Sequence, residues 1–422
     1  MLDIKFIREN QDLVKQSVKN RALKLDIDGL IKIDDARRKI LAELEELRSQ
    51  RNKANDEISV LLKEKKDAKP KISSMKKISS RINELEGQLK EQEAELNKLL
   101  LNIPNVPHPS IPVGDASQNK VVRDWGKERK FDFKPLNHME ICQNLDIIDF
   151  NRATKITGSN FILFKGWGAR LERALINFML ELHINKHGYT EVFPPFLVNR
   201  ASMFGTGQLP KLEEDMYKLK DDDLFLIPTA EVPVTNIFRD EILDEDKLPI
   251  YYTAYTACFR REAGSYGKDT KGLFRVHEFD KVEMVKFVRP EDSYDELEKL
   301  VANAEEVLQL LELPYRVKVL ATQDISFAAS KCYDLEVYSS GSDKWLEVSS
   351  CSNFESFQAR RANIRMRRKE TKKVDFLHTL NGSGVALART VAAIIENYQQ
   401  EDGSVSVPKS LQPYLNGQER IS

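Results

Sequence analysis

Residues 257–288 read ACFRREAGSYGKDTKGLFRVHEFDKVEMVKFV, and they predict two β-strands joined by a loop that contains three glycines. In a β-strand, side chains two residues apart point to the same face of the sheet. This period assigns two arginines, two glutamates and one phenylalanine to one face of the hairpin: Arg260, Glu262, Arg275, Phe279 and Glu283. We therefore expect a fold built around an antiparallel sheet, with a functional site on that face.

These side chains suit a nucleotide. A guanidinium group binds phosphate oxygens through two parallel hydrogen bonds, an aromatic ring can stack on a purine, and a carboxylate can accept from an amino group. A ladder of surface salt bridges explains any single Arg–Glu pair better, but it explains the full set of five less well. The common phosphate loops are absent, because residues 264–268 have the wrong spacing and residues 382–384 lack the third glycine.

Two other clusters carry oxygen ligands. In the stretch PTAE, Thr229 and Glu231 share strand parity, with a hydrated turn as the alternative. The stretch EVSSCSN, residues 347–353, combines a carboxylate with hydroxyls, which is a ligand set that Mg²⁺ accepts together with substrate phosphates. Glu347 and Ser350 can share a face only if the strand contains a bulge, because their spacing is odd.

A fourth cluster is NGSGVALAR, residues 381–389, where a glycine-rich turn leads towards an apolar helix over 390–398. Glycines before a helix allow close backbone packing, and Arg389 adds a permanent positive charge. The alternative is an ordinary turn followed by a surface arginine.

The N-terminal part of the chain has a different pattern. Residues 30–103 are rich in Glu, Lys, Leu and Ile, and apolar residues recur every 3.5 positions on average, which predicts a coiled coil. Pro70 divides the pattern into two antiparallel helices. Such a hairpin can be a dimerisation rod. Its tip, residues 63–77, holds seven lysines against two acids, which would suit contacts with nucleic-acid phosphates.

Length and composition predict a two-domain protein of the cytoplasm. The 422 residues exceed the usual size of one core, and the net charge of −1 means that any polyanion site must come from local clustering. The four scattered cysteines predict neither a zinc site nor a disulfide framework. No signal peptide or membrane span is expected.

A proline-rich stretch near residue 105 marks the domain boundary. We predict a helical domain with a coiled-coil arm at 1–105, a linker at 106–130, and an α+β domain at 131–422 in which an antiparallel sheet is flanked by helices.

Three stretches resemble the motifs of the seryl-tRNA synthetase family: FRREAGSYGKDTKGLFRVHEFDKVEM (259–284), EVSSCSNFESFQARR (347–361) and HTLNGSGVALART (378–390). The resemblance covers essentially the whole chain, including the arm. It implies a class II aminoacyl-tRNA synthetase of the ordinary bacterial type, which joins L-serine to tRNA(Ser) through a seryl-adenylate; charging of tRNA(Sec) is left open. It also implies a homodimer, because the helix over 170–187 and the following GYTEVFPPFLV, with Pro195, match the family's motif 1.

The resemblance implies roles for residues that match the family's motifs. Arg260 would bind the ATP α-phosphate and the serine carboxylate, and Arg389 would bind the γ-phosphate. Glu262 would meet the adenine amino group, Val276 would contact the nucleotide through its backbone, and Phe279 would stack on the adenine. Further ATP contacts are implied at Arg261, Glu347, Val348, Ser349 and Ser350.

Two of these residues, Glu347 and Ser350, would also hold Mg²⁺. The implied serine pocket consists of Thr229, Ala230, Glu231, Glu283 and Ser383. The arm would contact tRNA(Ser), and neither DNA nor a membrane is an expected partner. The chain departs from the family's usual pattern at Ala388, around Ser326 and at Glu355, none of which is an implied ligand.

Two other functions remain as alternatives. A class II paralogue could load an amino acid onto a carrier protein, although such a ligase would not need the arm. A nucleic-acid-binding coiled-coil protein could carry a relict catalytic domain, although every implied ligand is present here.

Overall fold

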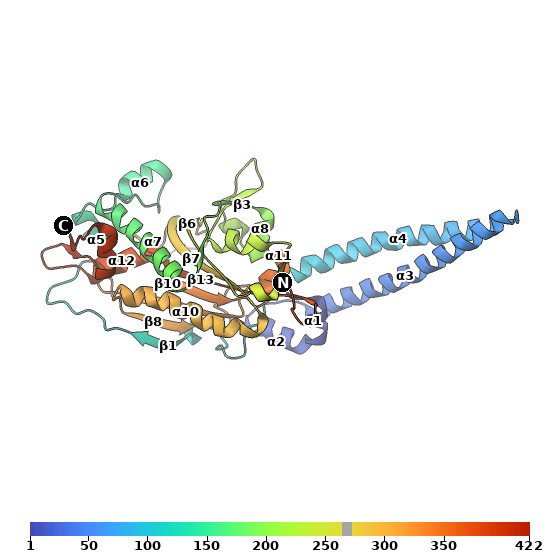
Figure 1. Ribbon diagram of the computed structural model, residues 1–422, viewed down its shortest axis with the longest axis horizontal. Helices are drawn as coiled ribbons and strands as arrows, with labels where there is room; N and C mark the ends of the chain where they lie inside the picture. Colours follow the sequence, from blue (N-terminus) through green and yellow to red (C-terminus); the bar gives the residue numbers. More distant parts are fainter. Residues whose placement is uncertain (264–271) are drawn as a thin grey trace. The chain divides into compact units, whose positions relative to one another are not determined.

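The computed structural model describes residues 1–263 and 272–422, and the chain folds into two compact units, Met1–Pro104 and Asn105–Ser422 (Figure 1). The first unit is helical, and the second contains a large sheet. The expected α+β class, with a helical arm and an antiparallel sheet, is confirmed. Among the described helices, none combines the length and the apolar character that crossing a membrane requires.

The helices of the first unit are α1 (Ile4–Glu9), α2 (Gln11–Asn20), α3 (Ile27–Lys63) and α4 (Lys69–Leu100). Helices α3 and α4 lie side by side and antiparallel, which confirms the helical hairpin (Figure 1). Asp26 caps α3, since its carboxylate accepts from the backbone N–H of Gly29 at 2.8 Å. Pro70 does not interrupt a helix but lies in the first turn of α4, where its missing N–H leaves no hydrogen bond unmade.

The seam of the hairpin is apolar. Leu44 of α3 is fully buried against Ile82 and Leu85 of α4. Nearer the chain termini of the unit, Leu100 is buried against residues of α1 and α2, whereas Leu99 is only partly buried. At this end of the hairpin, α1 and α2 also pack against α3 and α4, so a wider face of each long helix is buried. The repeat of 3.5 residues, which describes a seam between two helices, therefore no longer applies here.

The second unit is built on an eight-stranded sheet. Its spatial order is β1 (Lys120–Trp125), β8 (Tyr315–Val319), β9 (Lys331–Ser339), β10 (Lys344–Asn353), β13 (His378–Ala386), β7 (Glu278–Val288), β6 (Ile250–Phe259) and β2 (Thr190–Glu191). Neighbouring strands are antiparallel, except that the short β2 pairs with β6 in parallel. The predicted hairpin is thus the pair β6–β7, and only the short β2 lies beyond it at this edge of the sheet.

Helices and short strands surround the sheet. Long helices that pack on it are α7 (Trp167–Asn185), α10 (Ser293–Leu310) and α12 (Leu387–Asn397). Shorter helices are α5 (His138–Asn144), α6 (Phe150–Thr157), α8 (Arg200–Thr206), α9 (Glu231–Thr235) and α11 (Phe357–Ala362). Short strands form small sheets: β3 (Leu197–Asn199) with β4 (Leu224–Leu226); β5 (Ile242–Asp244) and β12 (Val374–Phe376) with β11 (Arg365–Arg367); and β14 (Val405–Ser406) with β15 (Arg420–Ile421).

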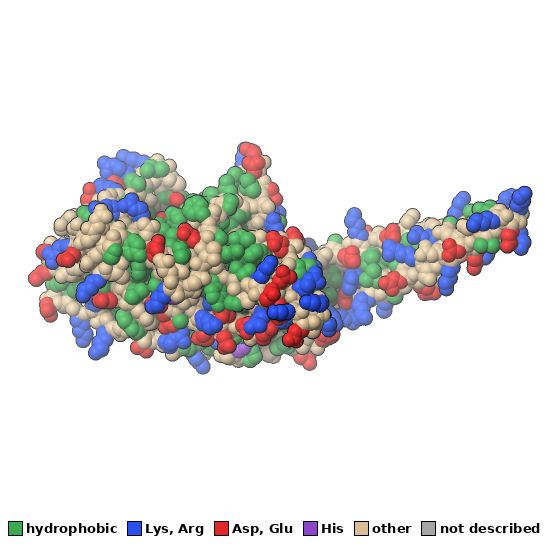
Figure 2. All heavy atoms as spheres, in the orientation of Figure 1, with side chains coloured by type: hydrophobic (Ala, Val, Ile, Leu, Met, Phe, Trp, Pro, Cys, Tyr) green, Lys and Arg blue, Asp and Glu red, His purple; other side chains and the backbone are tan. Residues whose placement is uncertain are grey.

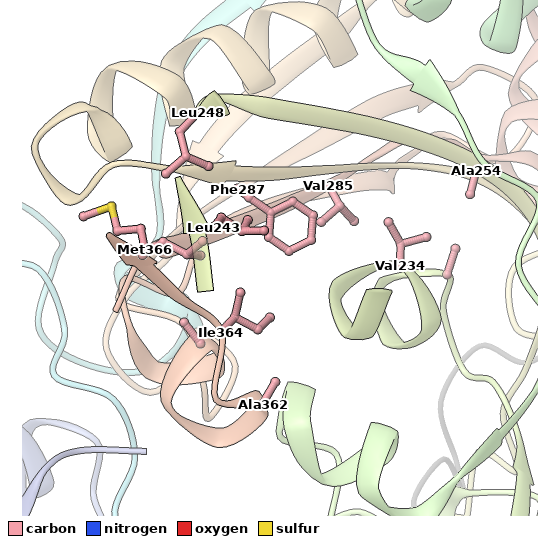
Figure 3. Close-up of a cluster of buried hydrophobic side chains, with 12 residues drawn as sticks. Val234, Leu243, Leu248, Ala254, Val285, Phe287, Ala362, Ile364 and Met366 are labelled. Atoms are coloured by element: carbon pink, nitrogen blue, oxygen red, sulfur yellow. The ribbon is translucent and has the colours of Figure 1, made fainter. Parts of the chain in front are cut away.

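Strand β7 presents different chemistry to its two faces. On one face, Val285 and Phe287 enter an apolar cluster with residues of α9, α11 and β5 (Figure 3). Within that cluster the Phe287 ring meets Phe238 edge-on at 5.0 Å. On the other face, Lys286 donates to Glu296 of α10 at 2.9 Å, and both side chains are buried. Val285 and Phe287 point to the same face of β7 as the residues that line the cavity described below. Their burial in the apolar cluster therefore fixes the orientation of that face.

The stretch 106–130, which we expected to be a linker, belongs to the second compact unit. Just before it, Asn105 donates to the carbonyls of Ala328 and Phe354 at 3.0 and 2.8 Å. Within it, the N–H of His108 donates to Ser330 O at 2.9 Å, and β1 joins the edge of the sheet. Prolines favour an extended chain, but the remaining backbone groups still find partners on the folded unit.

The four cysteines, Cys142, Cys258, Cys332 and Cys351, are free thiols, and all of them are buried. Burial raises the pKa of each thiol, to about 12 for Cys142 and for Cys351. Each thiol is consequently held in its protonated and unreactive form.

Because Leu44 is buried, we expect two Leu→Ala substitutions in α3, one at a buried and one at an exposed position, to differ in their effect on stability. Leu44→Ala should lower the free energy of opening α3 by about 2–5 kcal/mol, because it leaves a cavity against Ile82 and Leu85. Leu62→Ala, at a position that is 60% exposed, should change it by less than about 0.5 kcal/mol. Native-state hydrogen exchange of the α3 amides in the full chain measures both values, and equal effects would contradict the assigned seam.

Candidate functional site

A cavity lies over β7, β10, β13 and the start of α12. Most residues predicted for the two substrates line it: Thr229, Glu231, Arg260, Glu262, Val276, Phe279, Glu283, Glu347, Val348, Ser349, Ser350, Ser383 and Arg389. These residues come from positions as far apart in the sequence as Thr229 and Arg389, so the fold is what brings them together.

Two predicted residues do not line this cavity. Ala230, the residue before α9, is fully buried in the apolar cluster that also contains Val285 and Phe287, and it does not line the cavity. Arg261 points away from the cavity, and its guanidinium donates to the backbone carbonyl of Glu214 at 3.2 Å. Any contact that either residue makes with a substrate would need a different arrangement of its segment.

One end of the cavity is a buried acidic pocket. Lys281 donates to Glu283 Oε2 at 2.6 Å and to Thr229 Oγ1 at 2.7 Å. Thr229 and Ser383 each place a hydroxyl 3.4 Å from the same Glu283 oxygen. Glu283 therefore has one buried lysine and two hydroxyls as partners, and all four side chains are at least nine-tenths buried.

Glu231 lies in the same pocket without a cation of its own. Its Oε1 accepts from Gln358 Nε2 at 2.5 Å, and Gln358 in turn accepts from Thr379 at 2.8 Å. Burial, followed by the charge of Glu283, raises the pKa of Glu231 to about 7. Two carboxylates that share one lysine leave the pocket able to accept a further positive group, such as a substrate ammonium.

The other end of the cavity is rich in arginine. The Arg260 guanidinium lies 5.1 Å from the centre of the Phe279 ring, and its Nε donates to Pro228 O at 3.3 Å. Arg389 donates to the carbonyls of Phe274 and Glu347, at 3.1 and 2.6 Å. A guanidinium beside an aromatic ring, with a second fixed guanidinium in the same cavity, can bind phosphates and stack a base.

Alternation along a strand does not explain why Arg260, Glu262 and Arg275 lie together in the cavity. Strand β6 ends at Phe259 and β7 begins at Glu278, so Arg260, Glu262 and Arg275 lie outside the strands. They meet because the pairing of Phe259 with Glu278 brings the two flanking segments together. Glu262 has a φ of +51°, and its carboxylate forms an ion pair with Arg275. The central loop residues 264–271, with two of the glycines, lie outside the described residues.

The bulge that Glu347 and Ser350 require is present. The pairing of β10 with β9 shifts register between Glu347 and Ser349, which places one extra residue in β10. Asp334 of β9 pairs with Ser350, and burial, followed by the charge of Glu347, raises the pKa of Asp334 to about 8. Within residues 1–263 and 272–422, no group of three His, Cys, Asp or Glu is suited to hold a metal ion.

The oxygens of Glu347, Ser350 and Asp334 nevertheless suit a hard divalent cation that also takes ligands from phosphates. The repulsion between the two carboxylates is what a bound cation would relieve, so the residues present fit Mg²⁺.

The glycine-rich stretch before Arg389 forms a strand and not a turn. Residues 378–386 are β13, which pairs with β7 and shifts register between Ser383 and Val385. Helix α12 begins at Leu387, so Arg389 lies in its first turn. An added Cβ at Gly384 would lie 2.8 Å from His183 Nε2, so the glycine allows α7 to pack closely under this bulge.

Sequence reasoning missed several residues of the site. Lys281 could have been found, because it shares the strand parity of Phe279 and Glu283. Gln358 and Asn381 stand within two of the quoted motifs, but no spacing rule pointed to either of them. His138 lies outside every motif, and only the folded chain places it next to Leu273, a residue of the cavity wall.

Comparisons with known proteins agree with this architecture. Residues 1–107 match the model of the seryl-tRNA synthetase N-terminal domain, and residues 216–398 match the class II tRNA synthetase core domain (G, H, P, S and T). A serine–tRNA ligase of Thermoanaerobacter pseudethanolicus is 58% identical over 98% of both chains. The corresponding ligase of Carboxydothermus hydrogenoformans is 56% identical over 100% of this chain and 99% of its own.

Solved structures give the same result. Seryl-tRNA synthetase from Pyrococcus horikoshii, complexed with ATP, superposes with a TM-score of 0.94 and 40% identity over 100% of this chain and 99% of its own. The cytoplasmic enzyme from Naegleria fowleri, in complex with AMP, gives a TM-score of 0.90 and 29% identity, with the same coverage. With its helical hairpin, its antiparallel sheet and both matching domains, the chain belongs to the seryl-tRNA synthetases, a family of class II aminoacyl-tRNA synthetases.

Proposed function

We propose that L-serine and ATP react in the cavity over β7 to form seryl-adenylate and pyrophosphate, and that serine then passes to tRNA(Ser). One observation carries this assignment: a buried acidic pocket, Glu231 with Glu283, lies in the same cavity as two fixed guanidiniums, Arg260 and Arg389. The pocket suits the ammonium and hydroxyl of serine, and the guanidiniums suit its carboxylate and the phosphates of ATP.

The chemistry needs positioning more than acid–base catalysis. The serine carboxylate attacks the α-phosphorus in line, and the bond to pyrophosphate breaks. In the second step a ribose hydroxyl of the tRNA attacks the carbonyl of the adenylate, and AMP leaves. Arg260, beside the ring of Phe279, would neutralise charge at the α-phosphate, while Arg389 would hold the γ-phosphate.

The proposed contacts with adenine involve three residues. Phe279 would stack on the base, Val276 would contact it through its backbone, and Glu262 would accept from the amino group. Arg275 now pairs with Glu262, so binding of adenine would compete with or rearrange this ion pair. Val348 and Ser349 line the same region, while Arg261 and Ala230 would act only indirectly.

Glu347 and Ser350, with Asp334 close by, would hold Mg²⁺ on the phosphates. Bound there, Mg²⁺ would supply charge neutralisation of the triphosphate.

Specificity for serine would come from the buried hydroxyl partners. Alanine lacks the hydroxyl, so it would leave buried polar groups of the Thr229–Glu283–Ser383 cluster without a partner, which can reduce activity by about 10⁴–10⁵-fold. Threonine would be refused by its additional methyl group. The carboxylates would also discriminate against amino acids without a free ammonium.

Three further proposals concern assembly and location. The arm within 1–105 would contact tRNA(Ser), and tRNA(Sec) if it is served, through the lysines at its far end (Figure 2).

A homodimer would form through α7 and the segment after it, where Phe193 is 74% exposed beside a groove lined by Arg173 and Ile176. Four free thiols fit the reducing cytoplasm.

The function is tested by transfer of labelled serine to total tRNA in the presence of ATP and Mg²⁺, beside alanine and threonine. We expect charging with serine alone. Adenylate formation without any transfer to tRNA would favour a ligase that serves a carrier protein. Absence of activation would favour a relict binding protein.

The raised pKa of Glu231 predicts that serine binding depends on pH. Below about pH 7 the carboxyl is protonated in the free enzyme, so binding of the serine ammonium must release a proton and affinity should fall by up to about tenfold per pH unit. Calorimetry in two buffers of different ionisation enthalpy should show proton release at pH 6 and none at pH 8. Glu231→Gln should abolish the release.

Glu283→Gln is the matched control, because removal of its charge should lower the pKa of Glu231 and move the release to lower pH. Release that is unchanged in Glu231→Gln would show that another group titrates.

The lysines of the arm predict a selective defect. Replacing Lys65, Lys69 and Lys76 by serine should leave adenylate formation unchanged and weaken tRNA charging. It should also reduce the salt slope of tRNA binding by about one for each phosphate that the tip no longer neutralises. The matched control replaces Lys39, Lys53 and Lys90, which are exposed on α3 and α4 away from the tip. An equal defect in both triple variants would mean that the tip has no special role.

A further inference from the structure

We infer that His138 is a positioning residue for the ATP end of the cavity, with Glu396 as the group that orients it. The inference rests on the proposed function and extends it to a residue outside the family's motifs. His138 touches no substrate site itself. It holds the backbone of Leu273, which follows the central loop and forms part of the cavity wall.

Glu396 is a firmly held anchor. Its side chain is fully buried, and it accepts hydrogen bonds from both the backbone N–H and the Nδ1 of His138, at 2.7 and 2.8 Å. Ser342 donates to it through its hydroxyl and its N–H, and Ser339 and Gly341 donate as well. Burial would raise the pKa of Glu396, but the hydrogen bonds, with His138 first, outweigh it and hold that pKa below its ordinary value.

This anchor determines which nitrogen of His138 carries the proton. Because Nδ1 faces a carboxylate acceptor, it is the donor, and Nε2 of the neutral ring is then an acceptor. The backbone N–H of Leu273 points at Nε2 with an N···N distance of 3.3 Å. The buried imidazole thus connects a fixed carboxylate to a backbone N–H that lies 135 residues away along the chain.

The contact at Leu273 is close enough to restrict the sequence. Gly272 has a φ of +69°, and a Cβ added there would lie 2.2 Å from His138 Nε2 and 2.6 Å from Met139 Sδ. Any side chain at this position would push the segment off the imidazole. The ring of Phe274 packs on the same histidine, with 4.4 Å between ring centres.

The held segment leads directly to the proposed ATP contacts. Residues 273–276 all line the cavity, and the carbonyl of Phe274 accepts from Arg389 Nε at 3.1 Å. Arg389 and Glu396 lie about two turns apart on α12, and therefore on one face of that helix. Helix α12 consequently fixes the segment at two points, directly through Arg389 and indirectly through Glu396 and His138.

A helix pair of the second unit makes this arrangement rigid. The side chain of Gln399, just after α12, both accepts from the N–H of Leu136 at 2.7 Å and donates to its carbonyl at 2.9 Å. Asn137 caps α5 by accepting from the N–H groups of Met139 and Glu140, so the start of α5 cannot shift independently of α12. His138 is the first residue of that capped helix.

Two substitutions separate the functions of the two ring nitrogens. The amide of His138→Asn reaches the place of Nδ1 and can still donate to Glu396, but it leaves the Leu273 N–H without an acceptor. The longer His138→Gln places an amide oxygen where Nε2 was. Ser342→Ala is the matched control, because it removes a hydrogen bond to the same carboxylate without touching Leu273.

The experiment measures ATP and serine KM values in ATP–pyrophosphate exchange, ATP·Mg²⁺ binding by calorimetry, and thermal unfolding. We expect His138→Asn to raise the ATP KM and Kd about tenfold or more, with the serine KM within about twofold. His138→Gln should recover most of the ATP affinity, and Ser342→Ala should leave both KM values unchanged even if it lowers Tm.

Equal changes in both KM values, or equal behaviour of the Asn and Gln variants, would show that His138 is merely structural and would overturn the inference. Gly272→Ala is a second variant that opens the same contact from the other side, and it should reproduce the ATP defect even if His138→Asn fails to fold. Wild-type enzyme that binds ATP but activates no serine would count against the proposed function and not against His138, because the calorimetric comparison needs no serine.

Discussion

The register of β7 between β6 and β13 is the constraint on which the rest of the site depends. Phe279 lies opposite Cys258, and Glu283 lies opposite Ser383. A shift of one residue in either pairing would turn Phe279, Lys281 and Glu283 to the other face and remove both ends of the cavity at once. Val285 and Phe287 resist such a shift, because the same alternation that exposes the polar residues to the cavity buries these two in the apolar cluster (Figure 3).

Electrostatic balance divides the cavity into two chemically different ends. At one end carboxylates outnumber cations, and at the other end guanidiniums are held by backbone carbonyls, as Arg260 and Arg389 show. A charge that is held by neutral carbonyls keeps its attraction for a ligand, although Arg389 also lies 3.9 Å from the carboxylate of Glu347. Glu262 is paired more closely, since Arg275 neutralises it until a ligand intervenes.

Sequence periodicity predicted the features that repeat along one element, and it failed where elements meet. Alternation along β7 placed Phe279 and Glu283 correctly, and the odd spacing of Glu347 and Ser350 required the bulge that β10 contains. The same rule gave the right grouping for Arg260 and Arg275 for the wrong reason, because both lie beyond the strand ends. His138 could not be predicted at all, since its partners Leu273 and Glu396 are 135 and 258 residues away.

The burial of all four cysteines gives the molecule a practical property. Buried thiols with raised pKa values react slowly with maleimides and iodoacetamides, so such reagents should label the native cysteines very little. A single cysteine introduced on the exposed surface of α3 or α4 would accept a fluorophore or spin label without removal of the native ones. Such a label would report on the helical hairpin spectroscopically in a chain that keeps its own core intact.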